Sequence, residues 1–383
     1  MSNTIEYNNV GQIQWTIGAT LLNADGNESL GFAGAISGVS NDAFIFAGGA
    51  NFPNGMPWEG GKKYYSDQIR LLEKTDDGYA WNENVIATLP EPIAYCGSTS
   101  TDDGIVYIGG ENEDGISDKT FLLIWNPSNK QLEIKKLPNL PLALVNAGVA
   151  QIDNAVYVIG GDSTERSSNQ LFRLDLKKSN LYWEVLADLP VSLANTVAVA
   201  QNSPEGMQVY VFGGRTKTAS GISTLHHTTF SYHPLKNTWT ECAAISNGTD
   251  IINLSAGAGL ALGEDCVILA GGDDGIVFNQ IETSLAKIAK ANTAEEKQAL
   301  TEAKNELLLN HSGFYKGTLI YNTWENCWYK VGELPYAAQV TTTAVRWDNN
   351  IILASGEIKP GERTPDIIIG KIIANEYIKS SYQ

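Results

Sequence analysis

The sequence is poor in cysteine and histidine, and this shortage argues against metal and disulfide frameworks. Its 383 residues include four cysteines and four histidines. The cysteines lie far apart and form no Cys-x-x-Cys pair, so neither a zinc cage nor a set of disulfides is expected; they are Cys96, Cys242, Cys266 and Cys327. The histidines lack further ligands at metal-binding spacing. We therefore expect buried reduced thiols, no metal site and no cofactor.

Positive charge and long apolar runs are also scarce. The chain has 26 Lys and Arg against 43 Asp and Glu, a formal net charge of −17, and contains no basic block. Such a surface repels phosphate backbones and anionic lipid, so neither nucleic acid nor a membrane is expected as a partner. No apolar stretch reaches transmembrane length. Residues 1–6 lack the basic and apolar regions of a signal peptide, which predicts a cytoplasmic protein, or a periplasmic one if a leader has been removed.

What the sequence does contain is an internal repeat. Six segments share a polar turn, an apolar run of about five residues and a terminal Gly pair, which is Ser-Gly in the last; they are 42–49, 103–110, 154–161, 207–214, 265–272 and 349–356. Their last residues lie 61, 51, 53, 58 and 84 positions apart. A period of about 50 residues is typical of the kelch repeat, in which each unit is one blade of a β-propeller.

Aromatic residues mark the same place in successive repeats. Tyr232 precedes Trp239, and Tyr321 precedes Trp328, both at a spacing of seven. A Leu-Pro pair then leads into the next repeat, as at 89–90 and 189–190. Blades that cannot bury both faces alone stack in a ring to form a core. The sequence therefore predicts an all-β fold, a six-bladed kelch-type propeller that spans 1–383 as a single domain.

The two chain ends are expected to meet. The last repeat reaches residues 366–373 and then lacks a Trp-bearing outer strand, whereas the N-terminal region supplies Trp15. We expect residues near 10–18 to add the fourth strand to the sixth blade, which removes a free sheet edge.

The long fifth gap predicts an insertion in blade five, at about 279–311. Ile281, Leu285 and Ile288 have helical spacing, and Thr293 to Glu296 match a capping box before a second helical run. The prediction is a helical hairpin. It has two interpretations, a solvated decoration or a functional element that acts as a lid or as a homodimer surface.

Two loops after Gly pairs have an unusual composition. The loop at 50–67 is rich in Gly and Pro and carries aromatics and lysines, and the loop at 356–364 places Glu357 and Arg363 six residues apart around a Pro-Gly turn. Loops held by rigid blades are where propellers bind ligands. The simpler interpretations are a loop that packs on itself and an ordinary surface ion pair.

These loops carry a family resemblance. The stretches 31–53 (GFAGAISGVSNDAFIFAGGANFP), 62–69 (KKYYSDQI) and 355–364 (SGEIKPGERT) resemble segments of the bacterial N-acetylneuraminate epimerases, which are sialic acid mutarotases. The resemblance implies a six-bladed kelch propeller with a helical insertion in one blade. The segments occur here in a different order, which resembles a cyclic permutation of the family. A closed ring of blades tolerates such a permutation because its termini meet.

The resemblance also implies roles for individual residues. It makes Glu357 the catalytic proton acceptor and Arg363 a substrate-binding residue. The other substrate-binding candidates come from the first loop and from positions around the ring; they are Asn51, Lys62, Tyr64, Tyr65, Tyr95 and Arg215. Two arginines of the family are replaced here, near Ile93 and near 192–195, and Arg215 is the candidate substitute. The implied substrate is a small sugar.

Three functions remain open at this point. The first is a mutarotase that acts on a sialic acid, with Glu357, Arg363 and the 51–65 loop at one mouth of the channel. The second is a non-catalytic kelch module that binds a protein or a glycan through an apolar patch. The third is a glycoside hydrolase, which requires two opposed carboxylates about 5–10 Å apart. Its candidates follow strand ends and are Glu59, Asp67, Glu111 and Glu357.

Overall fold

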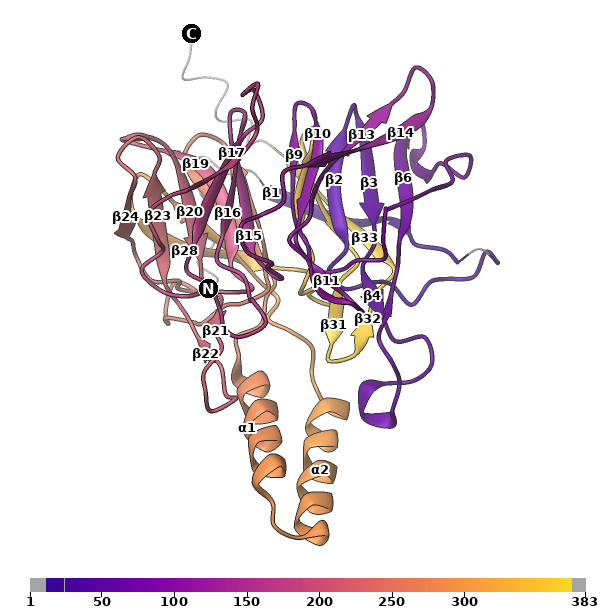
Figure 1. Ribbon diagram of the computed structural model, residues 1–383, viewed down its shortest axis with the longest axis vertical. Coiled ribbons are helices and arrows are strands. Elements are labelled where there is room, and N and C mark those ends of the chain that lie inside the picture. Colours follow the sequence, from indigo (N-terminus) through magenta and orange to yellow (C-terminus); the bar gives the residue numbers. More distant parts are fainter. Residues whose placement is uncertain (1–11, 24, 374–383) are drawn as a thin grey trace, which may run out of the picture.

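The computed structural model describes residues 12–23 and 25–373. Within them the chain forms six blades around a central channel, each an antiparallel sheet of four main strands (Figure 1). The first blade contains β2 (Ile36–Ser40), β3 (Ala43–Ala47), β6 (Gln68–Thr75) and β7 (Gly78–Trp81), with β8 (Ala87–Thr88) paired to β6. The second contains β9 (Gly97–Thr101), β10 (Gly104–Ile108), β13 (Thr120–Asn126) and β14 (Gln131–Leu137). The third contains β15 (Gly148–Ile152), β16 (Ala155–Ile159), β17 (Leu171–Asp175) and β18 (Trp183–Val185).

The remaining blades repeat this plan and close the ring. The fourth contains β19 (Val197–Ser203), β20 (Gly206–Phe212), β23 (Thr229–His233) and β24 (Thr238–Glu241). The fifth contains β25 (Ala258–Leu262), β26 (Cys266–Ala270), β27 (Gly317–Asn322) and β28 (Cys327–Glu333). The sixth contains β29 (Ala344–Trp347), β30 (Asn350–Ala354), β33 (Asp366–Ile373) and β1 (Gln12–Thr20). The predicted six-bladed propeller is confirmed.

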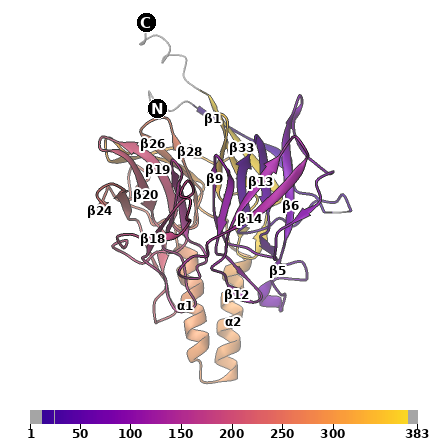
Figure 2. The same cartoon turned by 45° about the horizontal axis from the view of Figure 1, so that its top comes forward.

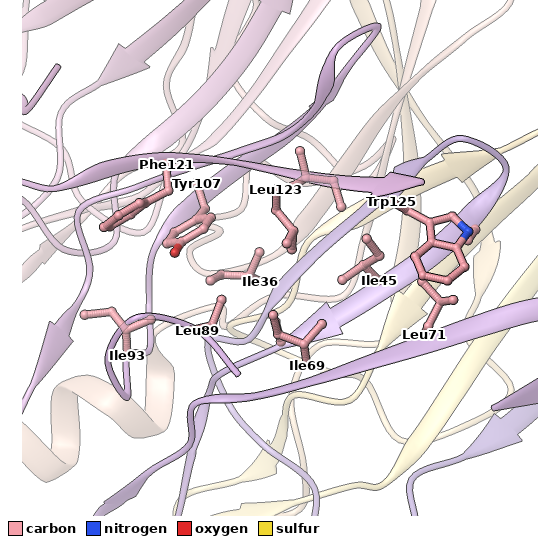
Figure 3. Close-up of a cluster of buried hydrophobic side chains, with 13 residues drawn as sticks. Ile36, Ile45, Ile69, Leu71, Leu89, Ile93, Tyr107, Phe121, Leu123 and Trp125 are labelled. Carbon is pink, nitrogen blue, oxygen red and sulfur yellow. The ribbon is translucent and has the colours of Figure 1, made fainter. Parts of the chain in front are cut away.

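The apolar run of each repeat becomes the second strand of its blade. In β3, β10, β16 and β26 every residue is buried, because neighbouring blades cover both faces of the strand. Each core cluster therefore joins two blades, as Figure 3 illustrates with Ile45 and Leu71 beside Leu123 and Trp125. The outer-strand tryptophans add a hydrogen bond between blades; for example, the Trp239 indole N–H donates to the Ala187 carbonyl at 2.8 Å.

The N-terminal strand completes the sixth blade, as predicted. β1 pairs antiparallel with β33, with Trp15 opposite Gly370. The indole ring covers that glycine so closely that a Cβ at position 370 would lie 2.5 Å from it. The strand runs two residues further along the chain than the predicted 10–18, and residues 10 and 11 lie outside the described residues.

The insertion in blade five is a helical hairpin, made of α1 (Ile276–Lys290) and α2 (Ala294–Leu309). It begins three residues before the predicted 279–311. The Thr293 hydroxyl caps α2 by accepting the Glu296 N–H at 3.1 Å. Neither helix contains a buried residue, and the hairpin projects from the face that also carries β4, β21, β31 and β32 (Figures 1 and 2). Its role as decoration, lid or dimer surface stays a prediction. Among the described residues, neither helix combines the length and apolar character needed to cross a membrane.

A closed ring of backbone hydrogen bonds surrounds the channel. Six residues, one before each inner strand, each donate an N–H to the carbonyl of the preceding member at 2.7–3.1 Å; they are Gly34, Tyr95, Asn146, Asn195, Ala256 and Thr341. All six have φ between +53° and +65°, although five are not glycine. Such backbone persists only where the surrounding structure holds it, so the ring is a rigid frame. It lines a narrow cavity of about 110 Å³.

Candidate functional site

A second set of six equivalent residues lies next to this frame, and we call it the mouth ring. Each member is the first residue after a Gly pair. It forms an antiparallel bridge with the residue that directly precedes one of the six frame residues in the sequence. The members are Ala50, Glu111, Asp162, Arg215, Asp273 and Glu357. All but Ala50 are ionisable, so these positions bring five ionisable side chains to one mouth of the channel.

Four short hairpins continue from the mouth ring and carry further side chains. They are β4 (Ala50–Asn51) with β5 (Tyr64–Tyr65), β11 (Glu111–Asn112) with β12 (Gly115–Ile116), β21 (Arg215–Thr216) with β22 (Thr224–Leu225), and β31 (Glu357–Lys359) with β32 (Glu362–Arg363). A 3-10 helix (Pro57–Glu59) lies within the loop of the first.

Glu357 and Arg363 face each other across the β31–β32 hairpin, as the sequence pattern of a Pro-Gly turn between them implies. They are paired in register, and Arg363 Nη2 lies 3.3 Å from Glu357 Oε2. The Gly361 N–H donates to Glu357 Oε1 at 2.8 Å. Burial raises the pKa of Glu357 above its ordinary value, although Arg363, the Gly361 N–H and Lys63 oppose the rise. The carboxyl is thus desolvated but retains partners for its charged form.

The Arg363 guanidinium pairs with Glu357 through one nitrogen and leaves its other two nitrogens without a partner in the described residues. Its side chain is only 4% exposed, and its carbon Cζ lies 4.7 Å above the centre of the Phe52 ring. Nη2 contacts Glu357, whereas Nε and Nη1 are buried and have no hydrogen-bond partner within the described chain. Unpaired buried donors are costly, so these N–H groups are suited to an anionic or carbonyl group of a ligand.

The first loop brings Lys63 and Tyr65 to the mouth ring. Lys63 Nζ lies 2.9 Å from Glu111 Oε1, and the Tyr65 hydroxyl donates to the same oxygen at 3.0 Å. Lys63 also lies 5.0 Å from the centre of the Tyr95 ring. Burial raises the pKa of Tyr95, while Lys63 and Arg363 lower it. These contacts join blades one and two beside Glu357.

The other two candidates from this loop, Lys62 and Tyr64, directly precede Lys63 and Tyr65 in the sequence, and both are exposed. Lys63, the neighbour of Lys62, is the lysine that pairs with Glu111. Asn51 is buried, donates to the Gly31 carbonyl at 2.9 Å, and leaves Oδ1 without a partner in the described residues.

Arg215 is held by an acidic neighbour. Its Nη2 lies 2.7 Å from Asp162 Oδ2, and Lys217 Nζ lies 3.3 Å from the same oxygen. The Ser167 hydroxyl donates to Asp162 Oδ1 at 2.7 Å. Asp162, which the sequence analysis did not single out, therefore offsets much of the Arg215 charge. Arg215 leaves Nη1 buried without a partner in the described residues, whereas Arg363 leaves both Nε and Nη1.

Asp273 was also missed from the sequence. Its Oδ1 accepts the Gly275 N–H at 2.8 Å, and burial raises its pKa to about 6. The available signal was positional, because Asp273 directly follows the fifth Gly pair as Glu357 follows the sixth. Among the described residues there is no group of three His, Cys, Asp or Glu side chains that could hold a metal ion.

The sequence was compared with known proteins. It matches the family model described as N-acetylneuraminate epimerase over residues 2–134 and 137–381. It is 32% identical to the N-acetylneuraminate epimerase of Salmonella typhimurium over 234 residues, which cover 61% of this chain and 57% of that protein. It is 27% identical to that of Haemophilus influenzae over 237 residues, 62% of this chain and 60% of that protein. The matched regions thus span less than two thirds of these relatives. Because the family model covers nearly the whole chain, this protein belongs to the N-acetylneuraminate epimerase family.

Proposed function

We propose that this protein is a mutarotase, an isomerase that interconverts the two anomers of a sialic acid such as N-acetylneuraminate. The observation that carries the proposal is the pairing of Glu357 with Arg363, whose Nε and Nη1 are buried and unused. In a sialic acid the carboxylate and the anomeric hydroxyl are attached to the same carbon. A base placed beside unpaired guanidinium N–H groups suits that arrangement.

The reaction follows from these two side chains. Arg363 binds the substrate carboxylate through hydrogen bonds from its unpaired N–H groups. Glu357 accepts the proton of the anomeric hydroxyl, the ring oxygen receives a proton, and the ring opens to a ketone. The carbonyl turns its other face, and the ring closes to the other anomer. Positioned proton transfer contributes about 10²–10⁴-fold to a rate.

The local electrostatics support a base of intermediate strength. Burial raises the pKa of Glu357, which makes the carboxylate a better proton acceptor, while Arg363 and the Gly361 N–H keep a charged form accessible. The five ionisable members of the mouth ring favour a catalytic site over a non-catalytic module that binds through an apolar patch.

Two of the carboxylates considered for a hydrolase, Glu111 and Glu59, are less suited to that role. Glu111 is paired with Lys63 and accepts from Tyr65. Glu59 is exposed and accepts the Met56 N–H at 3.0 Å. Both are therefore committed to local structure rather than opposed to Glu357 across a substrate.

Anomer exchange followed by NMR tests the proposal. A sialidase releases α-N-acetylneuraminate, and its conversion to the β-anomer is recorded with and without the protein. We expect wild type to accelerate the conversion and Glu357→Gln to lose about 10²-fold or more of that acceleration. Glu362→Gln is the matched control, because Glu362 lies on the same hairpin but is exposed.

The outcomes separate substrate from activity. Failure of wild type with sialate, together with acceleration of glucose, galactose or N-acetylmannosamine mutarotation, would refute the sialic acid substrate. Failure with all four sugars would refute the mutarotase. Full activity in Glu357→Gln would remove Glu357 from its role as base.

A further inference from the structure

We infer that Asp273 is the general acid of this reaction, the side chain that gives a proton to the ring oxygen while Glu357 takes one from the anomeric hydroxyl. The inference rests on the proposed mutarotase activity. It adds a second catalytic residue from a different blade, so that the two proton transfers are divided between blades five and six.

The first argument is position. Asp273 and Glu357 are equivalent members of the mouth ring in adjacent blades. Asp273 exchanges backbone hydrogen bonds with Ser255 at 2.8 and 2.9 Å, and Glu357 does the same with Val340 at 3.0 and 2.9 Å. Equivalent backbone geometry in neighbouring blades directs the two side chains into the same mouth. The two carboxyls are close enough that Glu357 influences the titration of Asp273.

The second argument is charge. Glu111 is paired with Lys63, Asp162 with Arg215, and Glu357 with Arg363. In the part of the chain that the structure describes, Asp273 is the acidic member of the mouth ring without an ion pair. Its carboxyl receives the Gly275 N–H on Oδ1. A desolvated carboxyl that lacks a cation is the one that keeps its proton most readily.

The titration behaviour agrees with this geometry. Burial raises the pKa of Asp273, the Gly275 N–H opposes the rise, and the charges of Asp274 and Glu357 add to it; together they bring the pKa to about 6. Asp274 itself accepts the Ile276 N–H at the start of α1. Its charge raises the pKa of His311, and the charge of Lys359 lowers it. The surroundings of Asp273 are therefore acidic on both sides.

The proton balance closes without any further reactant. The Glu357 carboxylate removes the anomeric proton, and the O–H electron pair forms the carbonyl. The bond between the anomeric carbon and the ring oxygen breaks, and that oxygen takes the proton of Asp273. The open-chain ketone thus leaves Glu357 protonated and Asp273 ionised. Ring closure on the other face reverses both transfers and restores the starting site.

The test is the pH dependence of mutarotation in Asp273→Asn. We expect kcat to fall about 10²-fold or more, because the amide cannot give up a proton, while KM changes by less than about threefold. Wild type should show a bell-shaped profile whose alkaline limb reports Asp273, with an apparent pKa near 6, and the variant should lose that limb. Asp274→Asn is the control, because Asn can still accept the Ile276 N–H. It should keep activity and both limbs, with the alkaline limb moved to lower pH because the Asp274 charge no longer raises the pKa of Asp273.

A measurement without turnover makes the test independent of folding in the variant. In wild type labelled with ¹³C at aspartate carboxyls, the Asp273 signal should titrate well above the ordinary value of 3.8. An active wild type whose Asp273→Asn variant keeps its rate and its alkaline limb would overturn the assignment of Asp273 alone. An Asp273 signal that titrates at or below 3.8 would do the same. A wild type inactive on every sugar would overturn the proposed function, and this inference with it.

Discussion

Arg363→Lys separates the charge of Arg363 from its hydrogen-bonding geometry. Lysine keeps a positive charge beside Glu357, which lies 3.3 Å from Nη2 in wild type. It cannot reproduce the two separate unpaired donors Nε and Nη1, both of which are buried within the described chain. An Arg-to-Lys change is not conservative where a carboxylate is bound by guanidinium N–H groups held in fixed directions.

The magnitude follows from the hydrogen bonds lost. Hydrogen bonds to charged groups contribute about 1.5–3 kcal/mol, and each 1.36 kcal/mol is a factor of ten. Losing one such bond to the substrate carboxylate should raise KM for N-acetylneuraminate about 10- to 150-fold. The effect on kcat should be smaller, because Glu357 keeps a cation beside it. Mutarotation of a sugar without a carboxylate should show no such rise in KM.

The assay is the NMR exchange experiment repeated over a range of sialate concentrations. KM reports binding here only if chemistry is slow relative to substrate release, which single-turnover measurements check. A KM within twofold of wild type would refute the claim that the unpaired N–H groups of Arg363 bind the substrate carboxylate.

Two further predictions concern stability. Gly356→Ala should lower the free energy of unfolding, measured by urea titration, by at least about 1–3 kcal/mol, because φ is +117° and a Cβ would lie 2.8 Å from the Val340 carbonyl oxygen. Gly60→Ala is the control, with φ +90° and no atom within 4 Å of the added Cβ, and it should cost less. Equal costs would contradict the role of the close contact. Because folding raises the pKa of Asp273 from 3.8 to about 6, its ionisation opposes folding, so wild-type stability should fall as pH rises through this window. Asp273→Asn should lack that fall and gain up to about 3 kcal/mol over wild type at pH 7; unchanged pH dependence in the variant would count against the raised pKa.

Much of the fold could be predicted because its signals are local. A run of five apolar residues such as 43–47 is a buried strand wherever it lies, and the Gly pair that follows is needed where the chain turns at positive φ. The closing strand required one further step, that a last blade without an outer strand must find one at the other terminus. The insertion was readable from helical spacing, although α1 begins three residues before the predicted boundary.

The site was less accessible from sequence. Glu357 and Arg363 were singled out by the family resemblance, and the Pro-Gly turn between them allows both to lie on one hairpin. Lys62, predicted to bind substrate, is exposed, whereas the adjacent Lys63 is paired with Glu111, and the sequence did not distinguish the two. Asp162 was missed because its partner Arg215 lies 53 residues away.

The sequence by itself determined the number of blades, the closing strand, the inserted hairpin and the Glu357–Arg363 pair, because each depends on periodicity or on residues close in the chain. Only the tertiary structure decided how the charges of the mouth ring are shared: Lys63 with Glu111, Arg215 with Asp162, and Asp273 beside Glu357 without a cation among the described residues. The physical reason is that these interactions act between blades. Their strength depends on distance and burial across the channel mouth, which the spacing of residues along the chain does not specify.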